Sequence, residues 1–260
     1  MRRALALIGL CAALQASGAD LSPAAVRELA PSGTMRVAVA YGSPVLVNRG
    51  SGQLRGVAVD IAHELQRQTG LRLEFVRYDR TPKLLAELQS DVCDVAFVSL
   101  EVARAARMAI TPSYMEIDLT YLVAARSRFQ SVADIDSPGV RVVVQEHNTT
   151  DLFLSTRLMQ AVIFRVSDEP GALRLLKAGA AEAYASNREQ LLTAAESDGS
   201  YRVLADRFST ISHVVAVPSR RLAAAAYLRA FMEDLKASGF VERAIQNAAV
   251  RGAAVAAPAN

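Results

Sequence analysis

The chain has 260 residues, of which 52% are hydrophobic, and it is long enough to bury a sizeable core in one large domain or two medium ones. Its 29 basic and 26 acidic side chains leave a formal net charge of +3 at pH 7. A nucleic-acid-binding protein needs a clustered basic face, so this near balance of charge argues against a nucleic-acid partner.

The first 19 residues have the order of a secretory signal peptide. Residues 1–3 include two arginines, residues 4–14 are apolar, and residues 15–19 end in the small side chains of Ser17, Gly18 and Ala19. The apolar run is shorter than the roughly 20 residues that cross a bilayer. We therefore expect residues 1–19 to be cleaved and the mature chain to begin near Asp20 in the periplasm; the competing interpretation is a buried N-terminal helix.

The sequence offers no metal, cofactor or disulfide site. The three histidines, His63, His147 and His213, lie far apart without metal-ligand spacing, and no phosphate-binding, dinucleotide or hydrolase motif occurs. Loss of Cys11 with the signal peptide leaves Cys93 unpaired, and strand alternation places it inward as a small buried side chain. We expect no cofactor, no metal and a frayed tail over the last ten residues.

Strands and helices alternate along the mature chain. The first group of expected elements comprises strands at 35–40, 71–76, 93–100 and 119–124, with helices at 59–68 and 81–89. The alternation then restarts with a short helix at 131–135, a strand at 140–145, a helix at 151–158, a strand at 162–166, a helix at 170–178, a strand at 181–185, a helix at 188–196, strands at 201–205 and 213–217, and helices at 221–238 and 241–248. Two successive α/β units with largely parallel sheets predict two lobes.

Four segments together resemble one protein family. They are Gly56-Val57-Ala58-Val59-Asp60-Ile61-Ala62, Asp94-Val95-Ala96-Phe97-Val98-Ser99, the run from Ala103 to Thr111-Pro112-Ser113-Tyr114, and Gly139-Val140-Arg141-Val142-Val143-Val144-Gln145. In this order they are similar to motifs of the bacterial extracellular solute-binding proteins of family 3, the periplasmic amino-acid-binding proteins of ABC transporters. The similarity covers essentially the whole mature chain.

The resemblance implies an α/β fold of the type II periplasmic binding protein class, with a ligand cleft between two lobes. Lobe I would comprise residues 20–118 and 209–260, and lobe II residues 119–208, with hinge crossings near 116–119 and 208–213. The implied function is a monomeric receptor, not an enzyme, that captures a small amino-acid-like or carboxylate solute by lobe closure. Its implied partner is an inner-membrane ABC permease.

Three candidate ligand residues lie at the end of one strand of lobe I. In the family, an arginine at the position of Arg104 binds the ligand carboxylate. A guanidinium can donate two parallel hydrogen bonds to a carboxylate. Ser99 stands where the family often has a ligand-binding hydroxyl, although a strand-end serine can equally bond its own turn. Glu101 departs from the family's Ser or Thr. It could pair with Arg104, receive a cationic group of the ligand, or be a solvated surface residue.

Four further candidates come from loops. Tyr41 could supply an aromatic lid over the ligand or simply pack beneath its loop. Asn148 and Thr149 match the family's "GTT" segment, which contacts the carboxylate from lobe II, and they also suit helix N-capping. Asn187 stands near the Asp that binds the ligand's ammonium group in many amino-acid binders. An amide lacks that charge, so other carboxylates are also conceivable ligands.

Two other functions compete with the transport receptor. Some dehydratases of aromatic-amino-acid precursors share this resemblance, and Glu101 would be the general acid in that case, provided that burial raised its pKa. A sensor subunit that docks on a membrane receptor is the second alternative, and the sequence does not separate it from a transport receptor.

Overall fold

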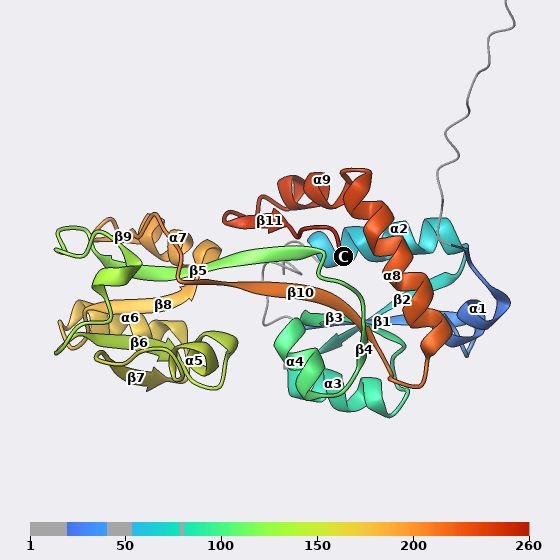
Figure 1. Ribbon diagram of the computed structural model, residues 1–260, viewed down its shortest axis with the longest axis horizontal. Coiled ribbons are helices and arrows are strands. Elements are labelled where there is room, and N and C mark those ends of the chain that lie inside the picture. Colours follow the sequence, from blue (N-terminus) through green and yellow to red (C-terminus); the bar gives the residue numbers. More distant parts are fainter. Residues whose placement is uncertain (1–19, 41–53, 79–80, 260) are drawn as a thin grey trace, which may run out of the picture.

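The computed structural model describes residues 20–40, 54–78 and 81–259 and shows two lobes joined side by side (Figure 1). The strands are β1 (Thr34–Ala40), β2 (Arg72–Tyr78), β3 (Val95–Ser99), β4 (Ala109–Ile110), β5 (Met115–Ala124), β6 (Arg141–Gln145), β7 (Val162–Val166), β8 (Ala183–Asn187), β9 (Tyr201–Val203), β10 (Ser209–Val217) and β11 (Ala253–Val255). The helices are α1 (Pro23–Leu29), α2 (Val57–Thr69), α3 (Thr81–Gln89), α4 (Leu100–Ala105), α5 (Thr149–Leu154), α6 (Glu169–Lys177), α7 (Arg188–Ser197), α8 (Leu222–Ala237) and α9 (Phe240–Asn247), with a 3-10 turn at Val132–Asp134. No helix in this described part is long and apolar enough to cross a membrane.

A single hydrogen-bonded path of strands runs through both lobes in the order β2-β1-β3-β10-β5-β8-β6-β7. The pairs within each lobe, β1 with β2 and β3, and β6 with β7 and β8, are parallel, as expected for strands separated by helices. The two central strands, β10 and β5, are antiparallel to their neighbours. The α/β, two-lobed architecture predicted from the sequence is confirmed.

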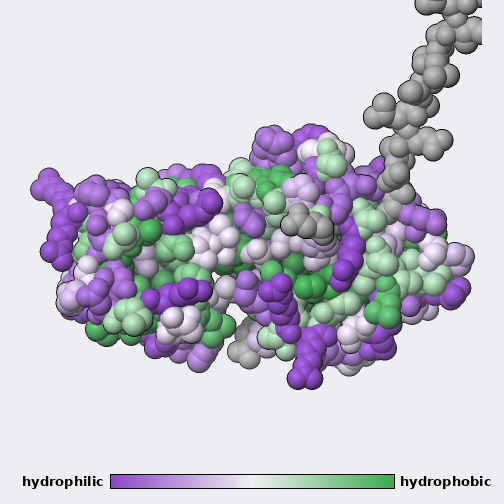
Figure 2. Space-filling view, in the orientation of Figure 1, coloured by the Kyte–Doolittle hydropathy of each residue, from purple (hydrophilic) through white to green (hydrophobic). Residues whose placement is uncertain are grey.

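Strands β5 and β10 connect the lobes. They pair with each other from Leu119 opposite Ser209 to Met115 opposite His213. One end of β10 pairs with β3, and the other end of β5 pairs with β8. Strand β5 begins at Met115, four residues before the expected start, because the pairing with β10 continues the ladder through the crossing. In Figure 2 the surface is hollowed between the two lobes, below this pair of strands, on the side where Figure 1 places α4 and α5.

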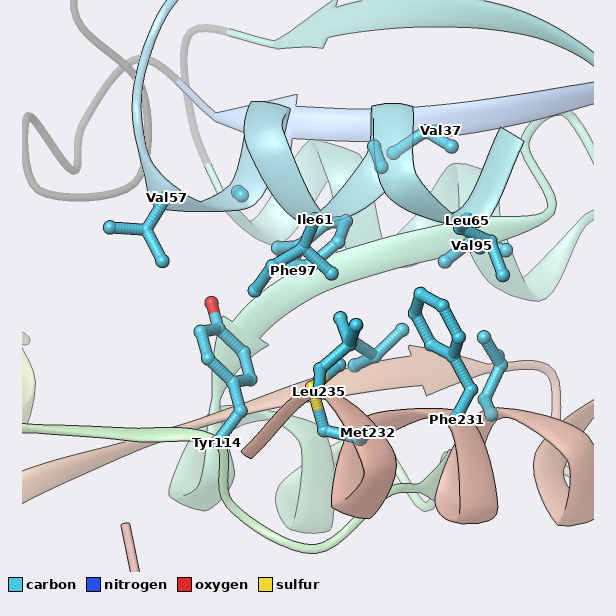
Figure 3. Packing of buried hydrophobic residues seen from close by; sticks show 14 of the residues in the cluster. Val37, Val57, Ile61, Leu65, Val95, Phe97, Tyr114, Phe231, Met232 and Leu235 are labelled. Carbon is cyan, nitrogen blue, oxygen red and sulfur yellow. The ribbon is translucent and has the colours of Figure 1, made fainter. Parts of the chain in front are cut away.

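Each lobe has its own hydrophobic core on both faces of its part of the sheet. In lobe I, side chains of α2, β3 and α8 meet in one cluster, and Tyr114 lies with its ring edge-on to Phe97, 6.0 Å between centroids (Figure 3). A second lobe I cluster contains Cys93, which is fully buried as expected. Burial raises the pKa of the Cys93 thiol to about 11, so it is a poor nucleophile. Lobe II has corresponding clusters under α5 and under α6 and α7.

The expectation of a frayed C-terminal tail is wrong. Residues 253–255 form β11, which pairs antiparallel with β5 from Ala253 opposite Ile117 to Val255 opposite Met115. The next backbone N–H, of Ala256, donates to the carbonyl of Tyr114 at 3.1 Å, and Ala256 is buried. The alanine-rich composition gave no strand signal, and the segment is ordered because it completes the edge of β5. The connection between the lobes therefore has three strands over part of its length.

Candidate functional site

The chain leaves β3 at Ser99 and turns directly into α4, which carries two of the predicted ligand residues. Ser99 caps this helix without a side-chain hydrogen bond, so its hydroxyl is not used by its own turn. Glu101 lies in the first turn and Arg104 in the last, and both side chains are exposed. Within the described residues no ion pair joins Glu101 to Arg104. The guanidinium and the hydroxyl are thus both available to a ligand.

The loop between β6 and α5 carries Asn148 and Thr149. Asn148 is the N-cap of α5, and its side-chain oxygen accepts from the N–H of Asp151 at 2.8 Å. His147 adopts a φ of 61°, a left-handed conformation that is uncommon for a residue with a side chain. The two expected roles of Asn148 are compatible, because its amide N–H₂ stays available when its oxygen caps the helix.

Asp151 holds this loop in place, a role that the sequence did not reveal. Its buried carboxylate accepts from the N–H of His147 at 3.0 Å, from Ser155 at 3.1 Å and from Arg165 at 2.9 Å. Burial acts to raise the pKa of Asp151, but these donors outweigh burial and hold the pKa below its usual value. The carboxylate is therefore ionised at neutral pH. It fixes the backbone at His147, directly before Asn148 and Thr149.

Asn187 ends β8 and caps α7, as an asparagine at a strand-to-helix junction often does. Its oxygen accepts from the N–H of Gln190 at 3.0 Å, and its amide N–H₂ donates to the side chain of Gln190 at 3.3 Å. Both polar groups are thus already engaged within lobe II. A ligand contact by Asn187 would have to share or replace the bond to Gln190.

The carboxyl ends of β3 and β8 meet the crossing strands at two different levels. Ser99 lies opposite His213, which lies opposite Met115, whereas Asn187 lies opposite Leu119. Four residues of β5 separate the two levels, which is about 13 Å at roughly 3.3 Å per residue. The two strand ends therefore lie in different lobes, one at each end of the pairing between β5 and β10. Tyr41 lies outside the described residues.

His213 is a buried polar residue beside Ser99 that sequence reasoning did not place in the site. Its side chain is 5% exposed, and its Nδ1 has no hydrogen-bond partner in the described part of the chain. Burial lowers the pKa of His213 to about 4, opposed by a backbone hydrogen bond to Ile211. The ring is therefore neutral at pH 7. A single histidine without motif context gave no signal for this position.

We expect His213 to make the protein less stable in mild acid. Between pH 6.5 and pH 4 the unfolded chain binds a proton on this ring and the folded chain does not, so stability is lost as the pH falls through this window. From pH 6.5 to pH 5 the loss is about 2 kcal/mol. Urea unfolding at both pH values measures it, and His213→Gln should abolish that share of the pH dependence. The exposed-site control His63→Gln should retain it, and an equal pH dependence in both variants would contradict the assignment.

The chain was compared with protein-family models, with curated proteins and with solved structures. The family model of the bacterial extracellular solute-binding proteins, family 3, matches residues 35–247. A curated cyclohexadienyl dehydratase of Pseudomonas aeruginosa is 28% identical over 159 residues, 59% of this chain, and the chain spans 59% of that relative's length.

Solved structures of this fold cover most of the chain. An amino acid ABC transporter substrate-binding protein of Streptococcus pneumoniae, bound to L-arginine, has a TM-score of 0.68 at 18% identity and covers 86% of this chain and 97% of its own. The ancestral amino-acid-binding protein AncCDT-1, a precursor of cyclohexadienyl dehydratase, has a TM-score of 0.68 at 20% identity, over 85% and 97% of the two chains. The periplasmic VFT2 domain of Bordetella pertussis BvgS has a TM-score of 0.70 at 18% identity, over 86% and 98%.

The structures share the two-lobed fold, and the family model covers more than four-fifths of the described part of the sequence, including the strand end at Ser99, the helix of Arg104 and the crossing strands. The chain belongs to the bacterial extracellular solute-binding proteins, family 3.

Proposed function

We propose that the protein is a periplasmic receptor that captures a small amino-acid-like carboxylate between its two lobes. The observation that carries this proposal is the arrangement at the end of β3. There Arg104 is exposed with no ion-pair partner among the described residues, and the Ser99 hydroxyl does not cap its own helix. A guanidinium with no internal carboxylate is suited to bind the carboxylate of a ligand.

The second set of contacts would come from lobe II. The loop fixed by Asp151 presents Asn148 and Thr149, and Figure 1 places their helix, α5, on the same side of the crossing strands as α4. A carboxylate held by Arg104 and by this loop binds better when the lobes are closed than when they are apart. Only such a difference in affinity shifts the equilibrium toward the closed state.

The closed form would be the signal that a membrane partner recognises. We assign residues 1–19 as the export signal, residues 20–118 and 209–260 to lobe I, and residues 119–208 to lobe II. An ABC permease is the partner expected for a family 3 receptor that acts as a monomer. A ligand sensor subunit that docks on a membrane receptor is the alternative function in which the same closure would be recognised.

An enzymatic function is the second candidate, and the dehydratase relative is the observation that favours it. A carboxyl group that acts as general acid near neutral pH needs a buried environment. Glu101 is exposed on α4, and the relative is similar over only part of each chain. These facts favour binding without turnover.

A thermal-shift screen tests the proposal. The probes are L-arginine, L-lysine, the other proteinogenic amino acids, small organic acids and cyclohexadienyl precursors. A ligand present at one hundred times its Kd stabilises the folded chain by about 2.7 kcal/mol. Recovery of the stabilising compound unchanged after incubation supports a receptor, whereas its conversion supports the dehydratase. No stabilisation by any carboxylate in the panel would contradict the proposed ligand class.

A further inference from the structure

The C-terminal segment 249–256, here called the C-terminal strap, spans the two lobes. Its attachment to lobe I is extensive: β11 pairs with β5, Ala256 donates to the carbonyl of Tyr114, and Lys236 of α8 donates to the carbonyl of Ala257 at 2.8 Å. The strap follows α9 directly, so it moves with lobe I.

One arginine of the strap, Arg251, forms ion pairs with lobe II. The guanidinium of Arg251 binds Glu189 of α7 with two parallel hydrogen bonds, Nε to Oε2 and Nη2 to Oε1, both 3.0 Å. The backbone N–H of Arg251 donates to the same carboxylate at 2.8 Å. Arg251 also binds Glu196 and contacts the hydroxyl of Thr193 at 3.3 Å. Residues 189, 193 and 196 follow one face of α7, so the whole face is engaged.

The approach of the strap to lobe II is close. The carbonyl of Gly252 accepts from the N–H of Asp118 at the end of lobe I at 2.8 Å, and a Cβ on Gly252 would lie 2.5 Å from Cδ of Arg188 in lobe II. Gly252 also has a φ of +73°, which favours glycine. Arg188 in turn binds Asp118 at 3.0 Å. Beside these contacts lies an open surface depression of about 590 Å³, lined by Glu189 of α7 and by residues of α9 and the strap.

The strap and the ligand residues lie on opposite sides of the connection between the lobes. In Figure 1, β11 and α7 lie above β5, whereas α4 and α5 lie below it, where Figure 2 shows the hollow. When two bodies rotate about a hinge so that one side closes, the opposite side opens. Closure over a ligand therefore pulls α7 away from Arg251.

We propose that the contact between Arg251 and Glu189 is a latch that stabilises the open arrangement of the lobes and so sets the affinity for the solute. A latch made only in the open state lowers the closed population, and the observed Kd rises by the same factor. Removing the latch should raise the closed population about fivefold, the order expected for a partly exposed ion pair.

Distance measurements on the ligand-free full chain test the latch independently of the solute's identity. Spin labels on Lys83→Cys in α3 and Leu152→Cys in α5 report on the lobe separation, since these side chains are 70% and 62% exposed and the native Cys93 is fully buried. In the Arg251→Ala variant the short-distance population should increase about fivefold. The control Arg243→Ala removes the same charge from α9, where Arg243 bonds only the carbonyl of Ser238 among the described residues, and should leave the distances unchanged.

Glu189→Gln removes the latch from the opposite lobe and guards against a folding defect in Arg251→Ala. It should shift the distances in the same direction but by less, because Arg251 keeps its ion pair with Glu196, and the double variant should shift no further than Arg251→Ala. Distances in both single variants equal to those of the unsubstituted chain, or a shift toward longer distances, would overturn the proposal. Such a result would leave the ligand-binding proposal untouched, since no ligand takes part in the measurement.

Discussion

Replacing Arg104 with alanine is expected to weaken solute binding more than tenfold and to leave the melting temperature unchanged. The guanidinium is exposed at the end of α4 and has no ion pair among the described residues, so its loss breaks no ion pair in this part of the protein. A charged hydrogen bond to a carboxylate contributes roughly 1.5–3 kcal/mol, and about 1.4 kcal/mol corresponds to a tenfold change in Kd.

Calorimetry with the compound identified in the ligand screen measures the effect of Arg104→Ala. Arg107→Ala is the matched control, because Arg107 is also exposed, lies three residues further along and carries the same charge. Its affinity should equal that of the unsubstituted chain. Equal affinities for both variants, with normal melting curves, would remove Arg104 from the site.

The largest expected loss of stability follows from replacing Asp94 with alanine. The Asp94 carboxylate is fully buried and accepts from the backbone N–H of Arg36 at 2.9 Å, from its side chain at 2.8 Å and from Arg221 at 2.8 Å. Arg221 is itself only 6% exposed. Loss of the Asp94 carboxylate leaves the buried guanidinium of Arg221 and the partly exposed guanidinium of Arg36 without this counter-charge, which costs about 3–5 kcal/mol.

For a chain of this size, such a loss corresponds to a decrease in melting temperature of about 10 °C. Urea unfolding of Asp94→Ala measures the free energy directly. Glu64→Ala is the control, because Glu64 pairs within α2 with Arg67, whose side chain is 70% exposed, and pairs with a solvent-exposed partner contribute little. If Asp94→Ala were as stable as Glu64→Ala, the buried network would not stabilise the fold.

Local patterns predicted most of the elements. Helix α3 was expected at 81–89 and is Thr81–Gln89, and Asn148 caps α5 as its residue type favours. These features depend on hydrophobic periodicity and capping within a few residues, which a sequence displays directly. The two-lobed architecture followed from the restart of the α/β alternation and from the family motifs.

The features missed in the sequence depend on partners far along the chain. Strand β11 forms because it pairs with an edge of β5 that lies far away in the sequence. Arg251 binds Glu189, which lies 62 residues earlier in the chain. The alanine-rich tail and an isolated arginine carry no local signal of either contact. Likewise, the burial of His213 beside Ser99 depends on the pairing of β10 with β3, which the local sequence does not reveal. The candidate ligand residues could be predicted only where family motifs marked their positions.

Small-angle scattering with and without the identified solute tests the central claim, that the solute closes the two lobes on each other. Arg104 and Ser99 belong to lobe I and Asn148 and Thr149 to lobe II, so a solute held by both sets binds the closed arrangement better than the open one. The radius of gyration should fall when the unsubstituted chain is saturated and stay constant for Arg104→Ala at the same solute concentration. A radius that does not fall although calorimetry shows saturation would contradict closure.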